Sequence, residues 1–190
     1  MNVSQTLLAH RVPDLPADPE QVADALRRAG FEVLRIVPLA ELLQPIVVAK
    51  VESVTQHPNA DRLKVCVVND GTDQSLQIVT GADNVTAGAY YPVIRSGVRL
   101  PNGVKIKRGK MRGEVSEGML GSADELELGT DHAGLLTLSG EPVPGTPLPD
   151  VIDTPGVVFV IDGSHEVDDI VRKLGGEAPE PEAADGSPAA

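Results

Sequence analysis

The chain carries one uninterrupted series of basic side chains, and the chemistry available to such a series is phosphate binding. Seven basic groups and no acidic residue lie between positions 95 and 112, and Arg62 and Lys64 lie in a predicted loop and strand upstream of them. Convergent cations bind phosphates because neutralising several phosphates releases counterions, which supplies most of the affinity. A basic hairpin that is merely solvated would have the same composition, so both interpretations stay open here. The candidate nucleic-acid-binding residues are Arg62, Lys64, Arg95, Arg99, Lys105, Lys107, Arg108, Lys110 and Arg112.

The spacing of these cations predicts a hairpin that presents them on two faces. Lys105 and Lys107 are two positions apart and therefore share one face of a strand, whereas Arg108 takes the other. The two cations that follow are expected to repeat this arrangement after a turn at Gly109. The predicted surface is thus one continuous basic hairpin.

No second group of side chains has the pattern of a catalytic or metal site. His57 lacks a neighbouring nucleophile, and Ser116 does not lie in the strand-to-helix elbow of a hydrolase. Cys66 alternates with valines, which favours a packed side chain over a reactive thiol. Asp131-His132 is interpreted as a turn rather than an acid–base pair. The sequence therefore predicts no catalytic residue, no metal ligand and no cofactor.

Composition excludes several classes of protein. The chain has 190 residues, 41% of them hydrophobic, which is typical of one or two small globular domains. Only two Phe and two Tyr are present and Trp is absent, so a base-stacking platform is poorly supplied. No apolar run is long enough to span a membrane and no signal peptide is expected, so the predicted compartment is the cytoplasm. The net charge is −12, yet residues 44–112 hold ten basic and five acidic groups, and a local cationic surface can still bind phosphate.

The first 38 residues are predicted to form helices followed by a strand. Asp18-Pro19-Glu20 begins a helix with a capping Asp, a Pro in the first helical position and an acid in the first turn. Apolar residues recur at helical spacing until Gly30 ends the helix. Residues 32–38 alternate and predict a strand. A piece this short cannot bury a core alone, so it must pack on another part of the chain.

The middle of the chain is predicted to be a small β structure. Short β-branched or apolar runs separated by turn signals occupy residues 46–54, 63–68, 76–79 and 90–94. Such spacing fits a five-stranded Greek-key barrel of the oligonucleotide/oligosaccharide-binding (OB) type, with a small sandwich as the alternative.

The C-terminal part is predicted to add a strand, a helix and a tail. Residues 157–161 form a continuous apolar run typical of a strand, and Ser164 is expected to cap the helix that follows. Residues 177–190 contain proline, acidic and small residues without an apolar anchor, which predicts a disordered acidic tail.

Residues 57–66, HPNADRLKVC, resemble a signature of the tRNA-binding OB domain in the bacterial phenylalanyl-tRNA synthetase beta subunit. Further segments are similar to motifs that the same family carries in the same order. They are residues 26–33 (LRRAGFEV), 78–85 (IVTGADNV), 105–120 (KIKRGKMRGEVSEGML) and 131–134 (DHAG).

The resemblance implies a mainly β protein in which a five-stranded OB barrel is inserted into a small discontinuous α/β domain. The boundaries that we expect are 1–38 with 152–176 for the small domain, 40–149 for the tRNA-binding barrel and 177–190 for the tail. Gly121-Ser122 replaces the Cys-Ser usual in the family. The family subunit is several times longer and also has editing, catalytic-like and anticodon-binding domains, so the resemblance indicates a truncated or free-standing paralogue.

Three functions remain open from the sequence. The first is a tRNA-binding accessory protein that recognises shape and backbone with low sequence specificity. The second is an assembly module that docks on a synthetase subunit or forms a dimer with itself, which the acidic stretch 124–127 and the tail would favour. The third is a fragment of a phenylalanine–tRNA ligase beta chain, although the sequence shows no ATP site or amino-acid pocket. No membrane partner is expected.

Overall fold

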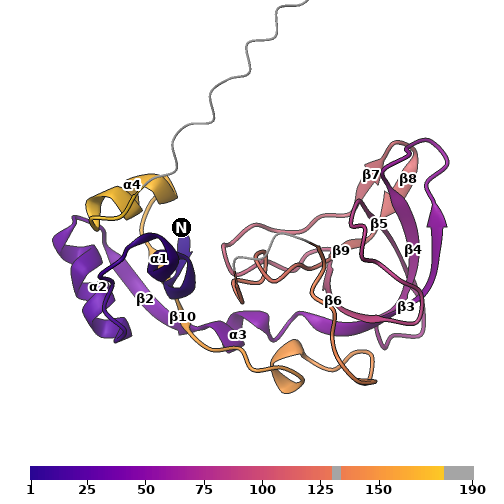
Figure 1. The fold of residues 1–190 in the computed structure, drawn as a ribbon, viewed down its shortest axis with the longest axis horizontal. Coiled ribbons are helices and arrows are strands. Elements are labelled where there is room, and N and C mark those ends of the chain that lie inside the picture. Colours follow the sequence, from indigo (N-terminus) through magenta and orange to yellow (C-terminus); the bar gives the residue numbers. More distant parts are fainter. Residues whose placement is uncertain (130–133, 178–190) are drawn as a thin grey trace, which may run out of the picture.

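The computed structural model describes residues 1–129 and 134–177. Two units lie side by side, and the chain passes from the first to the second and back again (Figure 1). The first unit contains both ends of the described chain, and the second contains its middle. Within the described ranges, no helix is long and apolar enough to cross a membrane.

The first unit is built on a three-stranded antiparallel sheet. Its strands are, in spatial order, β1 (Asn2–Ser4), β10 (Val157–Ile161) and β2 (Val33–Pro38). Three helices accompany the sheet: α1 (Gln5–Arg11), α2 (Pro19–Arg28) and α4 (Val167–Lys173). Leu26, Phe159 and Ile170 are completely buried in the core that these elements share. The N-terminal piece therefore packs on a strand from the C-terminal part, as its shortness requires.

The helix ends agree with the predictions at α2 and disagree at α4. Asp18 caps α2, because its Oδ1 accepts a hydrogen bond of 3.0 Å from the Glu20 N–H. The predicted cap of α4 is wrong: the N-cap is Glu166, which makes no side-chain capping bond. Ser164 lies upstream in an exposed loop, where the His165 Nε2 lies 2.8 Å from the Asp162 carbonyl oxygen.

The second unit contains the predicted five-stranded antiparallel barrel sheet. Its order is β5 (Leu76–Thr80), β4 (Lys64–Asn69), β3 (Val47–Gln56), β6 (Tyr90–Arg95) and β9 (Gly118–Leu120). Alternate side chains point inward, so Val51, Cys66, Ile78 and Val93 fill one buried core.

Hydrogen bonds between β5 and the segment before β9 nearly close this sheet into a barrel. The Glu117 N–H donates to the Gln77 carbonyl at 2.9 Å, and the Glu117 carboxylate accepts the Gln77 N–H at 3.1 Å. The hydroxyl of Ser116 accepts the Val79 N–H at 3.1 Å and donates to the Gly118 carbonyl at 2.9 Å. The barrel is therefore confirmed and the sandwich alternative is wrong.

Shorter elements complete the chain, and their bounds differ from those that the sequence predicts. A two-stranded hairpin, β7 (Gly109–Met111) and β8 (Glu114–Ser116), stands at the outer end of the barrel (Figure 1). Helix α3 (Leu39–Leu43) carries the chain from the first unit into the barrel, and the 3-10 helix η1 (Leu148–Asp150) lies on the return path.

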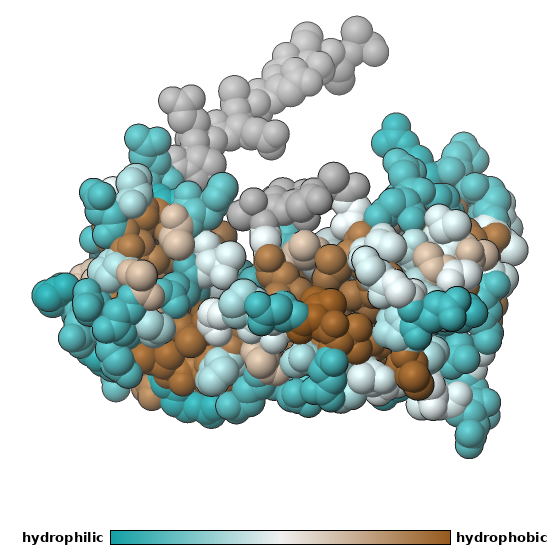
Figure 2. All heavy atoms as spheres, turned by 60° about the horizontal axis from the view of Figure 1, so that its bottom comes forward, coloured by the Kyte–Doolittle hydropathy of each residue, from teal (hydrophilic) through white to brown (hydrophobic). Residues whose placement is uncertain are grey.

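The two units share an apolar junction. Leu43 of α3, Leu126, Leu148 of η1 and Val158 of β10 belong to one buried cluster with residues of β6. Figure 2 shows hydrophobic atoms at the surface in the middle of the molecule and mainly hydrophilic atoms at the end where β7 and β8 lie. The junction thus holds the barrel against the first unit.

The predicted domain boundaries stay a prediction, since the elements on either side of them meet in this shared cluster. The predicted turn at Asp131-His132 lies outside the described residues, and so does the tail beyond Glu177.

Candidate nucleic-acid interface

The basic run is divided between two hairpins. The first spans residues 97–106, where the Leu100 and Ile106 N–H groups donate to the carbonyls of Val104 and Val98 at 2.9 Å. The second is β7–β8, whose tip is Arg112-Gly113. The predicted turn at Gly109 is wrong, because Gly109 begins β7.

The turn falls at Arg112-Gly113 because both residues have positive φ. Their φ values are +46° and +111°, the left-handed conformations that a two-residue hairpin turn requires. Glycine adopts this conformation freely, whereas an arginine held in it is uncommon. The hairpin therefore places Arg112, an exposed residue, at its tip.

The two hairpins place their cations at different parts of the protein. The first hairpin contacts the first unit, since the Asn2 side chain donates to the Pro101 carbonyl at 2.8 Å. Arg99 and Lys105 face each other across this hairpin and are exposed. Lys110 and Arg112 are exposed on the second hairpin, at the outer end of the barrel (Figure 1). Lys107 and Arg108 are exposed on the link between them, and Arg108 lies 3.7 Å from the Glu117 carboxylate.

The loop between β3 and β4 docks against the second hairpin. His57 is 3% exposed, and its Nε2 bonds to the Met111 carbonyl at 2.9 Å. Its Nδ1 accepts the Asn59 N–H at 3.0 Å, so Nε2 carries the proton that is donated to Met111. The Asn59 side chain donates to the Arg112 carbonyl at 3.3 Å. His57 is thus a structural residue that joins the loop to the hairpin.

Gln56, an exposed residue at the end of β3, organises the same loop, and no sequence pattern indicates this role. Its amide nitrogen lies 3.0 Å, 3.1 Å and 3.0 Å from the carbonyl oxygens of Ala60, Asp61 and Leu63. A side-chain amide that donates to several carbonyls of the loop after it can be identified only from the folded structure, because the loop must first curve back over the side chain. It holds the backbone on both sides of Arg62 in place.

Loop and hairpin together enclose a hollow of about 350 Å³ with a cation from each. It is lined by Ala60, Asp61, Arg62, Leu63 and Arg112. Arg62 and Arg112 are 50 positions apart in sequence, yet the docking of the loop brings both to one concavity. One carboxylate, that of Asp61, shares it.

Two predicted cations are engaged inside the protein. The Arg95 guanidinium pairs with the buried Asp70 carboxylate and also donates to the Asp70 carbonyl at 2.9 Å. Burial acts to raise the pKa of Asp70, but hydrogen bonds from Thr72 and Arg95 outweigh it and hold the pKa below its usual range. The Lys64 ammonium donates to the carbonyls of Ala82 and Asp83 at 3.4 Å and 3.0 Å. Both side chains are thus tied to neighbouring segments.

The other reactive side chains are built into the structure. Ser116 is 3% exposed and bridges β5 to β9. Burial raises the pKa of the Cys66 thiol, against a smaller opposing effect of Lys64, so the thiolate is disfavoured. Among the described residues, no group of three or more His, Cys, Asp or Glu side chains could hold a metal ion.

Comparisons with known proteins bear on this interface. Residues 46–147 match a family described as "Putative tRNA binding domain". The phenylalanine–tRNA ligase beta subunit of Bordetella parapertussis is 44% identical over 142 residues, which are 75% of this chain and 18% of that subunit. The corresponding subunit of Anaeromyxobacter dehalogenans is 37% identical over 175 residues, which are 92% of this chain and 22% of that subunit.

The chain therefore spans about a fifth of the length of the curated relatives that it matches. Among solved structures, a MetRS related protein from Pyrococcus horikoshii aligns with a TM-score of 0.40 at 22% identity, over 54% of this chain and 87% of that one.

Proposed function

The chain belongs to the tRNA-binding domain family, and on this premise we propose that it holds tRNA by the phosphate backbone and catalyses no reaction itself. The observation that carries the proposal is the convergence of Arg62 and Arg112 on one hollow through the docking of loop on hairpin. In OB folds the ligand lies over the strands between such loops, which is where these two elements stand.

The proposed binding surface consists of central cations, which we expect to contact any bound RNA, and peripheral cations, which only a larger RNA reaches. Its centre is Arg62, Lys110 and Arg112 on the docked loop and hairpin, all three exposed. Lys107 and Arg108 on the link extend it, and Arg99 and Lys105 reach it only for a ligand large enough to cover both hairpins. We leave Arg95 and Lys64 out, because the carboxylate of Asp70 and two backbone carbonyls already use their donors.

Binding through these cations is expected to be electrostatic and nearly independent of sequence. Of the four aromatic residues, Phe31, Tyr91 and Phe159 are buried and Tyr90 is half-buried beneath the Lys50 ammonium. Phosphate contacts position a nucleic acid without reading its bases. Affinity at physiological salt is then weak and depends on the shape of the tRNA.

The proposal that the chain catalyses no reaction is supported by the burial and hydrogen bonding of its potentially reactive side chains. Ser116 and Cys66 are buried, and His57 is used on both ring nitrogens. The family match covers residues 46–147, a tRNA-binding region. We further propose that the chain corresponds to the N-terminal, tRNA-binding part of the larger ligase subunits, with 40–149 as the barrel and 1–38 with 152–176 as the flanking domain.

The assembly alternative loses one of its supports. The acidic stretch 124–127 was expected to attract a protein partner, but Glu125 caps a turn through Ser122 and Glu127 accepts a hydrogen bond from Ser4. Leu126 between them is completely buried. Leu126 and Glu127 thus serve the internal junction.

The test is a salt titration of tRNA binding with a triple variant, R62A/K110A/R112N. Removing three phosphate contacts should weaken all tRNAs about equally and flatten the log–log salt slope by about 2 to 3 units. Asn at position 112 keeps the left-handed turn accessible, so the hairpin is retained.

The matched control is R28A/R35A/R172A, which changes the net charge by the same amount on exposed positions of the first unit. It should leave the slope within about one unit of the wild type. If both triple variants lost affinity equally, total charge would govern binding and the proposed surface would be wrong. If the wild-type chain bound no tRNA at low salt, the assembly interpretation would replace this one.

A further inference from the structure

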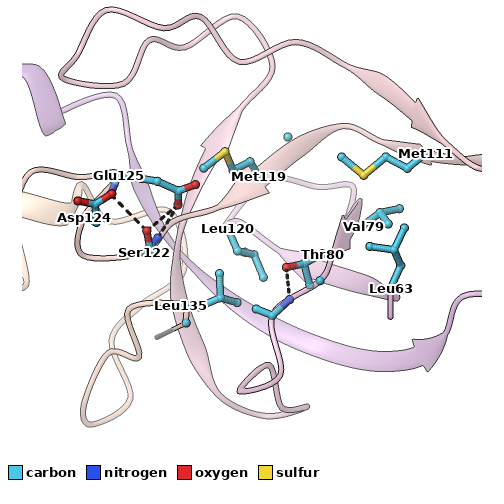
Figure 3. A pocket seen from close by; sticks show the side chains of 14 residues that line it. Leu63, Val79, Thr80, Met111, Met119, Leu120, Ser122, Asp124, Glu125 and Leu135 are labelled. Carbon is cyan, nitrogen blue, oxygen red and sulfur yellow. Dashed lines mark hydrogen bonds between the residues drawn. The ribbon is translucent and has the colours of Figure 1, made fainter. Parts of the chain in front are cut away.

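A second, larger hollow opens beside the cationic one. It holds about 500 Å³, within the range of small-ligand pockets, and Figure 3 shows its walls. The walls are mainly apolar: Leu63, Val79, Met111, Met119, Leu120 and Leu135. Met111 is 45% exposed although it is a large apolar residue. Exposed apolar surface of this extent on a small protein often marks a binding site.

The two ends of this hollow differ in charge. Leu63 lines both hollows, so the end formed by Leu63 and Met111 adjoins the pair Arg62 and Arg112. Glu125 lies at the opposite end (Figure 3), with its Oε2 accepting two hydrogen bonds from Ser122 at 2.8 Å and 2.9 Å. A carboxylate has about four acceptor sites, so it can accept a further donor.

We propose that this hollow receives one unpaired base of a bound RNA, with the flanking phosphate at Arg62 and Arg112. The inference rests on the proposed function, in which the phosphate contacts are independent of sequence, and adds to it a preference for unpaired nucleotides and for the base at this one position. A nucleotide has an anionic phosphate, apolar base faces and an edge that carries amino donors. The protein presents cations, then methionine and leucine side chains, then the carboxylates of Asp124 and Glu125, in the same order.

The order of charges also distinguishes a nucleotide from a peptide. A basic peptide segment would satisfy Glu125 but would meet two guanidinium groups at the other end. An acidic peptide segment would pair with the two guanidinium groups but would be repelled by the Glu125 carboxylate. A base inside a duplex cannot reach the hollow, because its edge is paired and its faces are stacked.

The carboxylate at the far end of the hollow also predicts which base is preferred. Carboxylates accept hydrogen bonds from the exocyclic amino group of cytosine, and a well-formed base contact discriminates by roughly 5- to 100-fold. Uracil has no exocyclic amino group. Cytosine is therefore expected to be bound in the hollow in preference to uracil.

The first experiment varies the RNA and keeps the wild-type protein. Fluorescence anisotropy at about 50 mM salt compares three single-stranded hexamers of equal charge: oligocytidine, oligouridine, and oligocytidine with its four inner bases removed. The base-free hexamer should bind at least about fivefold more weakly than oligocytidine, since one base contact is worth that much. Oligouridine should lie between them. Equal affinities for all three would overturn the inference and leave phosphate binding intact, whereas no binding of any RNA would overturn the proposed function itself.

The second experiment varies the protein. M119W fills the hollow, and V143W adds the same side chain at a position that is 71% exposed and lines neither hollow. M119W should reduce the ratio of affinities for intact and base-free hexamers to about one, and V143W should keep the wild-type ratio. E125Q should narrow the ratio between oligocytidine and oligouridine. An undiminished intact-to-base-free ratio in M119W, confirmed as folded by its thermal melt, would place the base elsewhere and overturn the inference.

Discussion

The Ser4 hydroxyl joins the two units of the protein: it accepts the Leu7 N–H at 3.0 Å and donates to the Glu127 carboxylate, 123 positions away in sequence. One buried side chain therefore both caps α1 in the first unit and holds a turn of the second. The link lies at the edge of the apolar junction, where Leu126 is completely buried.

Replacing Ser4 by Ala should destabilise the protein by about 1–2 kcal/mol, because the cap and the link are lost together. The measurement is the free energy of urea-induced unfolding. S164A is the matched control and should change stability by less than about 0.5 kcal/mol, since Ser164 caps nothing in the structure. Equal losses in the two variants would contradict the assigned cap.

The stability of the junction should depend on pH through Glu127. Burial raises the pKa of this carboxyl, the hydrogen bond from Ser4 opposes the rise, and the charge of Asp124 adds to it. An acid whose pKa is raised on folding binds protons more tightly in the folded state, so its contribution to stability falls as pH rises from about 4.5 through the folded pKa. E127Q removes this dependence. The free energy of unfolding of E127Q, relative to that of the wild type, should therefore increase as pH rises from about 4.5 through the folded pKa and then stay constant. Urea melts from pH 4 to 8 that show the same difference between the two proteins at every pH would contradict this.

His57 should matter for RNA binding although it carries no phosphate contact. H57A removes the bonds to Met111 and Asn59, which should cost about 1–3 kcal/mol and release the loop that carries Arg62. We expect weaker tRNA binding without any change in the number of cations. H10A, at an exposed position of α1, serves as the control in both unfolding and anisotropy measurements. Unchanged tRNA affinity in a folded H57A protein would show that the docking is not needed.

Arg112 should reveal a conflict between stability and binding. An arginine at φ +46° carries a backbone cost of about 1–2 kcal/mol that Asn largely avoids. R112N is therefore expected to raise the free energy of unfolding while it lowers RNA affinity and reduces the salt slope by about 0.7 to 0.9. Loss of stability in R112N would mean that the side chain, rather than the turn, supports the hairpin.

The barrel could be predicted from the sequence because its strands alternate and are bounded by strong turn signals. The bounds of the three-residue strands β7, β8 and β9 could not, since segments this short acquire strand pairing only from their neighbours. Arg112-Gly113 was not recognised as a hairpin turn because arginine is a poor residue for positive φ.

The candidate site was predictable in kind but not in extent. The sequence indicated phosphate-binding cations near positions 62 and 112, and a family resemblance linked them to RNA. It could not show that Arg95 pairs with Asp70, 25 positions away, or that the loop and hairpin dock. Both contacts join segments that are far apart in the chain, and the local sequence pattern of one segment contains no information about the other.

The central place of β10 in the first sheet has a consequence for synthesis on the ribosome. β1 and β2 have no sheet partner until residues 157–161 emerge, more than 100 residues after β2 ends. At about 5–20 residues per second, the first 38 residues wait for roughly 6–25 s while the whole barrel leaves the ribosome. The barrel, whose strands pair among themselves, is free to fold during this time. The segment of residues 1–38 is therefore completed only after the barrel that follows it along the chain, and its strand edges stay unpaired in the meantime.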